Sequence, residues 1–145
     1  MDDPHRLQRF VDAQEPVMDA VLAELRNGRK RSHWMWFVFP QIAGLGRSPT
    51  AQHYAIASLD EAKAFLAHPE LGTRLRRCTE LVNAVAGRSV LEIFGSPDDV
   101  KFHSSMTLFN HASDGDPPFA AALDKYFAGA ADPATLSILG GAPKR

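Results

Sequence analysis

Three segments of this chain place polar side chains beside aromatic residues or glycines, and each has residue types that bind anions or transfer protons. The first, residues 29–41, begins with basic residues and continues through His33 into six apolar residues. An unperturbed imidazole has a pKa of about 6.5, so His33 can contact a ligand or act as a general acid or base. The alternative is a structural histidine bonded to a backbone carbonyl. We expect His33 to be at least partly buried, and the candidate ligand contacts here are Lys30, Ser32, His33, Trp34 and Gln41.

The second segment is the loop at residues 42–50, which contains Gly44 and Gly46. Glycines allow backbone N–H groups to approach a ligand closely, and the N-terminus of a following helix favours an anion. A guanidinium group can bind a phosphate or carboxylate through two parallel hydrogen bonds. The loop matches neither a P-loop nor a dinucleotide-binding fingerprint, so its glycines have flexibility as an alternative explanation. The candidate contacts are Arg47, Ser48 and, shortly after the loop, Tyr54.

The third segment covers residues 94–109, and its polar residues share one helical face with phenylalanines. At 100° per residue, Lys101 and Ser105 lie within about 60° of Asp98. This face is either the wall of a ligand pocket or a polar network that ties the helix to its neighbours. Asp98 is also favoured in a first helical turn, with Lys101 as an exposed partner. Residues on the other side are expected to be solvated, namely Ser104, Thr107 and His111.

The elements that position these segments are predicted to be helices. Seven of the ten prolines follow a residue that can cap a helix, and proline itself is favoured at the first helical position. Apolar residues recur at steps of three and four, most clearly from Leu71 to Val85. We predict an all-α bundle of about seven to nine short helices. The pattern also predicts a break near Pro16, and a buried aromatic helix at residues 33–39.

Length and composition predict one domain. The chain has 145 residues, a formal net charge of -1 and one cysteine. We expect a single helical domain at residues 1–145, with a core at 4–139 and a frayed tail at 140–145. The lone cysteine and the absence of a signal peptide or long apolar run predict a cytoplasmic protein without a membrane partner.

Several chemistries receive no support from the sequence. Near-neutral charge argues against a nucleic-acid partner. The six histidines show no recognised metal-ligand spacing, so we expect no metal and no cofactor. Cys78 lies in the apolar stripe, which predicts a buried, inert thiol.

The motifs in the three segments resemble a known family. Residues 32–41 (SHWMWFVFPQ), 44–48 (GLGRS) with 54–56 (YAI), and 94–99 (FGSPDD) with 104–109 (SSMTLF) are similar to the bacterial domain of unknown function 1810, whose members are sometimes labelled calpastatin. The resemblance runs from about Leu7 to Leu139. It implies a mostly helical, single-domain fold, and it implies no established activity or catalytic residue.

Our preferred hypothesis is a domain that binds a small anionic or nucleotide-like metabolite, with cations holding the anion and Trp34 or Tyr54 stacking on a ring. An enzyme that uses the same pocket is the first alternative, with His33, Asp98 and Lys101 as candidate catalytic residues. A protein-interaction module without a small-molecule site is the second. The pocket hypotheses require the three segments to meet in space, and the oligomeric state stays open.

Overall fold

The fold is helical, as the sequence predicts. The computed structural model describes residues 3–140, which contain ten α-helices and no strand apart from one isolated bridge between Ile42 and Ile56. Ten helices exceed the seven to nine expected. Their bounds are α1 Gln8–Gln14, α2 Met18–Arg26, α3 Met35–Val38, α4 Pro49–His53, α5 Leu59–Ala67, α6 Leu71–Ala84, α7 Val90–Phe94, α8 Asp98–Ala112, α9 Pro117–Phe127 and α10 Pro133–Gly140. Of the tail predicted at 140–145, Gly140 is the last residue of α10, and the rest lies outside the described residues.

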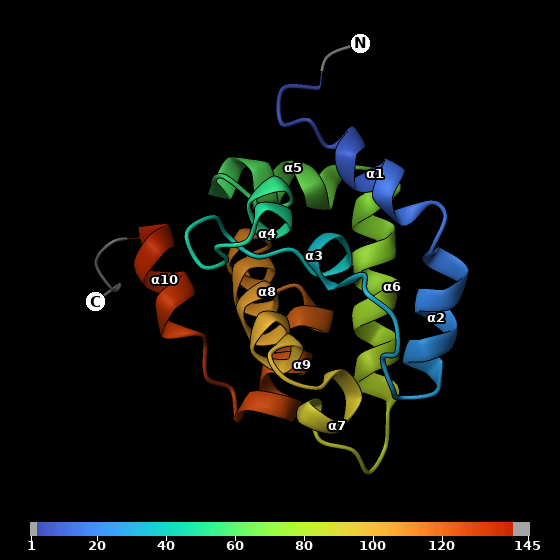
Figure 1. Cartoon of the computed structure of the whole chain (residues 1–145). Helices are drawn as coiled ribbons and strands as arrows, with labels where there is room; N and C mark the ends of the chain where they lie inside the picture. The colour runs from blue at the N-terminus through green and yellow to red at the C-terminus, as the bar shows by residue number, and fades with distance from the viewer. Residues whose placement is uncertain (1–2, 141–145) are drawn as a thin grey trace.

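The long helix α8 lies at the centre of the arrangement (Figure 1). Helices α5, α7, α9 and α10 all pack against it, while α6 packs against α2, α5 and α9. In Figure 1, α4 lies above α8 and α3 beside it, and the segment that joins them passes across the upper part of α8. Phe39, just after α3, contacts Phe102 of α8, and Trp36 of α3 lies beneath Lys101 of α8. The first two candidate segments therefore lie against the helix that carries the third.

Serine side chains begin several helices as predicted. Ser48, Ser58 and Ser89 each accept a hydrogen bond from a backbone N–H in the first turn of α4, α5 and α7. These bonds satisfy donors that the helix itself leaves unpaired. Residues 96–99 (SPDD) have the sequence pattern of a capping box, but none forms, because α8 begins at Asp98 without a side-chain cap. The predicted break at Pro16 separates α1 from α2.

Aromatic rings form the part of the core beneath the candidate segments. Phe39 lies 5.1 Å from Phe102 and 5.9 Å from Phe94, measured between ring centroids, and both contacts are edge-to-face. Trp34 is fully buried beside Phe39. The predicted buried helix at 33–39 is confirmed for Met35–Val38, although Trp36 remains half-buried.

The prediction that Ser104 and Thr107 face solvent is wrong. Both are buried, because helices surround α8 on several sides and α10 covers the face that the helical wheel assigned to water. Asp132, just before α10, forms hydrogen bonds with both hydroxyl groups. The Ser104 hydroxyl donates to the Asp132 carboxylate at 3.0 Å, and the backbone N–H of Asp132 donates to the Thr107 hydroxyl at 2.9 Å. His111 is exposed, as expected. None of the helices within residues 3–140 is long and apolar enough to cross a membrane.

Candidate functional site

A carboxylate held between two lysines connects the first and third segments. Lys30 Nζ lies 2.8 Å from Asp98 Oδ2, and Lys101 Nζ lies 3.6 Å from Asp98 Oδ1. The Lys30 side chain is 8% exposed and that of Asp98 is 18% exposed. No other carboxylate within residues 3–140 forms an ion pair with either lysine. Two ammonium groups therefore share the Asp98 carboxylate.

Each of these lysines also lies over an indole ring. Lys30 Nζ is 5.2 Å from the centroid of Trp34, and Lys101 Nζ is 5.0 Å from that of Trp36. Both distances are within the range of cation–π attraction. Trp34 is fully buried, whereas Trp36 is half-buried. The Lys101 ammonium group therefore lies beside an aromatic ring that solvent can reach.

All three segments meet around Trp36. A small cavity of about 10 Å³ is lined by Trp36 and by residues of the loop and of α8, including Gln41, Gly46, Tyr54 and Lys101. That volume is close to what one water molecule requires. A shallow groove of about 570 Å³ adjoins it and shares Trp36 and Tyr54 in its lining, together with Phe37, Pro49, Thr50 and His53. We call this second hollow the Trp36 groove, and its volume lies within the range of small-molecule sites.

The backbone before α3 is fixed by Glu24, a residue on α2. The Glu24 carboxylate accepts hydrogen bonds from the backbone N–H groups of Arg31 and Ser32, the Ser32 hydroxyl and Trp34 Nε1. Partial burial opposes ionisation of Glu24, but these four donors outweigh it and lower its pKa from 4.5 to about 2. Glu24 therefore anchors the segment that carries Lys30 and Trp34.

Three of the sequence-predicted contacts are not placed to touch a ligand. Trp34 and Ser105 are fully buried, so the expectation that Trp34 stacks on a ligand ring is wrong. The Ser32 hydroxyl donates to Glu24 at 2.6 Å, which assigns it a structural bond. His33 is exposed, and the expectation that it is at least partly buried is wrong. Trp34, the next residue, is buried in the core, whereas His33 lies before α3 and is exposed to solvent.

Of the remaining candidates, Tyr54 and Gln41 line the hollows around Trp36, whereas Arg47 and Ser48 do not. Tyr54 lines both hollows and packs its ring against Phe37 at 5.3 Å. Gln41 lines the small cavity, and its carbonyl accepts a hydrogen bond from the backbone N–H of Ile56. Ser48 caps α4, and Arg47 is exposed beside it. Arg47 lines neither hollow.

Sequence reasoning missed two residues. Trp36 lies within the aromatic run, but the run alone gives no sign of which ring remains accessible. Glu24 precedes Ser32 by eight residues, a separation that no local motif describes. Both roles depend on contacts with other parts of the chain, which no local sequence pattern describes.

The buried thiol behaves as predicted. Cys78 on α6 is fully buried, and burial raises its pKa to about 12. Among residues 3–140, no group of three His, Cys, Asp or Glu side chains is arranged to hold a metal ion.

The comparisons with known proteins now identify the family. The family model described as "Protein of unknown function (DUF1810)" matches residues 4–139. The chain belongs to this family. A crystal structure of the conserved hypothetical protein Rv1873 from Mycobacterium tuberculosis is similar in sequence and fold, with 58% identity and a TM-score of 0.93. That match covers 94% of this chain and 98% of Rv1873. A search of the curated proteins found no significant match.

Membership confirms the resemblance seen in the sequence motifs. The DUF1810 family is described as one of unknown function, so it assigns no catalytic residue, substrate or partner to this chain. A functional assignment must therefore come from the chemistry around Trp36.

Proposed function

We propose that this DUF1810 protein binds a small anionic or nucleotide-like ligand in the Trp36 groove. The observation that carries the proposal is the unequal charge at Asp98, where Lys30 and Lys101 share a single carboxylate. Lys30 is the closer and more buried of the two lysines, and it alone can neutralise Asp98. Lys101 is then a cation that charge balance within the fold does not require.

The position of Lys101 supports an anion as the ligand. Its ammonium lies over the Trp36 ring at 5.0 Å, and its side chain is 22% exposed. Trp36 and Tyr54 offer ring surface in the groove for a planar group. An acidic group of the ligand would reach toward Lys101, which lines the adjoining small cavity and not the groove itself. The ring contact assigned to Trp34 on sequence grounds passes to Trp36 in this proposal.

The experiment is a thermal-shift screen of nucleotides and sugar phosphates, followed by calorimetric titration of each hit. We expect a hit to raise the Tm of the wild-type protein, because a ligand that binds only the folded state stabilises it. The Lys101→Gln variant should weaken binding by ~10-fold, the loss expected for one charge-assisted hydrogen bond.

The control variant is Arg77→Gln, which removes an exposed cation of α6 outside both the Trp36 groove and the small cavity. This variant should bind the hit as the wild type does. Binding that is equal in Lys101→Gln and wild type would contradict the proposal, and so would a screen without any Tm increase. Mass spectrometry of metabolites that co-purify with the native protein provides an independent route to the same ligand.

A further inference from the structure

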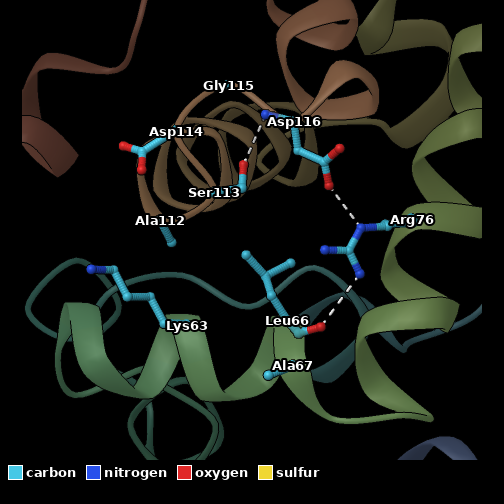
Figure 2. Close-up of a pocket in the computed structure, with 9 residues that line it drawn as sticks. All are labelled: Lys63, Leu66, Ala67, Arg76, Ala112, Ser113, Asp114, Gly115 and Asp116. Carbon is cyan, nitrogen blue, oxygen red and sulfur yellow. Dashed lines mark hydrogen bonds and ion pairs between the residues drawn. The ribbon is translucent and has the colours of Figure 1, made fainter.

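A second pocket lies on a different face of the fold from the Trp36 groove. It has a volume of about 430 Å³ and is formed by α5, α6 and the loop at residues 112–116 (Figure 2). We call it the α5–α6 pocket. It shares no lining residue with either hollow around Trp36. The helices contribute Lys63 and Arg76, and the loop contributes Asp114 and Asp116. Its volume suits a small molecule, and its walls carry opposite charges.

Arg76 is held in place by two hydrogen bonds that leave part of its guanidinium group available. Nε donates to Asp116 Oδ2 at 2.7 Å, and Nη1 donates to the Leu66 carbonyl oxygen at 3.3 Å. Nη2 has no hydrogen-bond partner among residues 3–140, and Figure 2 shows it pointing into the pocket. Nη1 carries a second N–H as well. The free edge of a guanidinium matches the two oxygens of a carboxylate.

The walls of the pocket are fixed before any ligand arrives. A Cβ atom on Gly72 would lie 2.1 Å from the Leu66 carbonyl oxygen, so only glycine allows α6 to approach the end of α5 this closely. In the opposite wall, the Ser113 hydroxyl accepts a hydrogen bond from the backbone N–H of Asp116 at 3.0 Å. Asp114 has a φ of 55°, in the left-handed region. A pre-formed pocket reduces the ordering cost of binding.

Two of the charged side chains that line the pocket form no contact that stabilises the described part of the fold. Lys63 and Asp114 are exposed, and neither side chain forms an ion pair or hydrogen bond within the described part of the chain. They belong to opposite walls. A simple anion would therefore face the loop carboxylates, and a simple cation would face Lys63 and Arg76. Only a ligand with both charges meets a complementary group on each wall.

We propose that the α5–α6 pocket binds a small zwitterion of the amino-acid type. The ligand carboxylate bonds to the free N–H groups of Arg76, and its ammonium group faces the carboxylates of the loop, Asp116 and Asp114. The Leu66 side chain projects into the pocket in Figure 2 and provides an apolar surface for the ligand side chain. This inference does not depend on the Trp36 groove.

The test uses the full chain labelled with ¹⁵N and three matched probes. L-leucine carries both charges, N-acetyl-L-leucine lacks the ammonium group, and L-leucinamide lacks the carboxylate. We expect L-leucine to shift the amide resonances of Asp114 and Gly115. N-acetyl-L-leucine and L-leucinamide should each bind at least ~5-fold more weakly than L-leucine. Equal binding of L-leucine and either derivative would overturn the zwitterion assignment. Absence of these shifts with L-leucine would overturn the site.

Variants locate the binding groups. Arg76→Gln should weaken L-leucine binding by ~10-fold, whereas Arg77→Gln, at an exposed neighbour on α6, should leave it unchanged. Because Arg76 also bonds within the fold, Asp114→Asn is the second test. Asparagine tolerates the left-handed backbone, so this variant keeps the loop and should weaken binding by ~3- to 5-fold. Unchanged binding in both pocket variants would overturn the proposal. Trp36→Ala should not affect L-leucine binding, which separates this site from the proposed function.

Discussion

Glu24 offers the sharpest test of how the candidate site is held together. Its carboxylate accepts four hydrogen bonds from the segment before α3, and its pKa falls from 4.5 to about 2. Since this pKa is lower in the folded state than in the unfolded chain, the ionised carboxylate stabilises the fold. That contribution is complete above a pH of about 4.5 and is lost as the pH falls toward about 2.

The size of this contribution follows from the pKa difference. At about 1.36 kcal/mol for each pKa unit, the change from 4.5 to about 2 corresponds to at most ~3.4 kcal/mol. Solvent screening of a partly exposed carboxylate reduces this, and we expect about 1 to 2 kcal/mol. Glu24→Gln keeps the side-chain shape but removes the charge. At pH 7 it should therefore lower the free energy of unfolding by about 1 to 2 kcal/mol and the Tm by about 3 to 8 °C.

The assay is urea denaturation of wild type and Glu24→Gln at a series of pH values from 7 to 3. The difference between their free energies of unfolding should be largest at pH 7 and should shrink below pH 4.5, because the wild-type carboxylate becomes protonated in the unfolded state. Glu80→Gln, at an exposed position of α6, controls for the loss of one surface charge. A difference that stays constant down to pH 3, or one that matches the control, would refute the role assigned to Glu24.

Three further predictions address packing and burial elsewhere in the molecule. A double-mutant cycle of Lys30→Met and Asp98→Asn, measured by urea denaturation, should give a coupling energy of about 1 to 3 kcal/mol, because the ion pair is largely buried. A coupling energy near zero would contradict this. Gly72→Ala should lower the free energy of unfolding by about 2 to 3 kcal/mol, since the new methyl group meets the Leu66 carbonyl; an unchanged urea midpoint would argue against that contact. Cys78 should react with iodoacetamide at pH 8 no faster than the native protein unfolds, and rapid labelling of the folded protein would be inconsistent with its burial.

The local parts of the fold could be predicted because their causes are local. A serine and the backbone N–H three residues later meet within one helical turn, so the caps at Ser48, Ser58 and Ser89 are visible in the sequence. Proline removes a backbone donor, which explains the break between α1 and α2. The apolar stripe from Leu71 to Val85 likewise defines the buried face of α6.

Contacts between distant residues could not be predicted in the same way. The helical wheel of α8 correctly groups Asp98 with Lys101, but it cannot show that Lys30, 68 positions earlier, supplies the closer ammonium group. The wheel also assigns Thr107 to solvent, because the residue that accommodates its hydroxyl, Asp132, comes from the segment before α10. Burial of polar residues depends on such partners, which only the packed structure reveals.

The two proposed sites have different lining residues but share one feature, a cation that an ion pair within the fold holds in place. In each, an internal ion pair fixes a cation while part of its binding capacity stays free: Asp98 holds Lys101 beside Trp36, and Asp116 holds Arg76 beside the α5–α6 pocket. An exposed side chain would lose rotamer freedom on binding, whereas a cation that the fold already orients loses less. The second ammonium group at Asp98 is the observation on which the proposed anion site beside Trp36 rests.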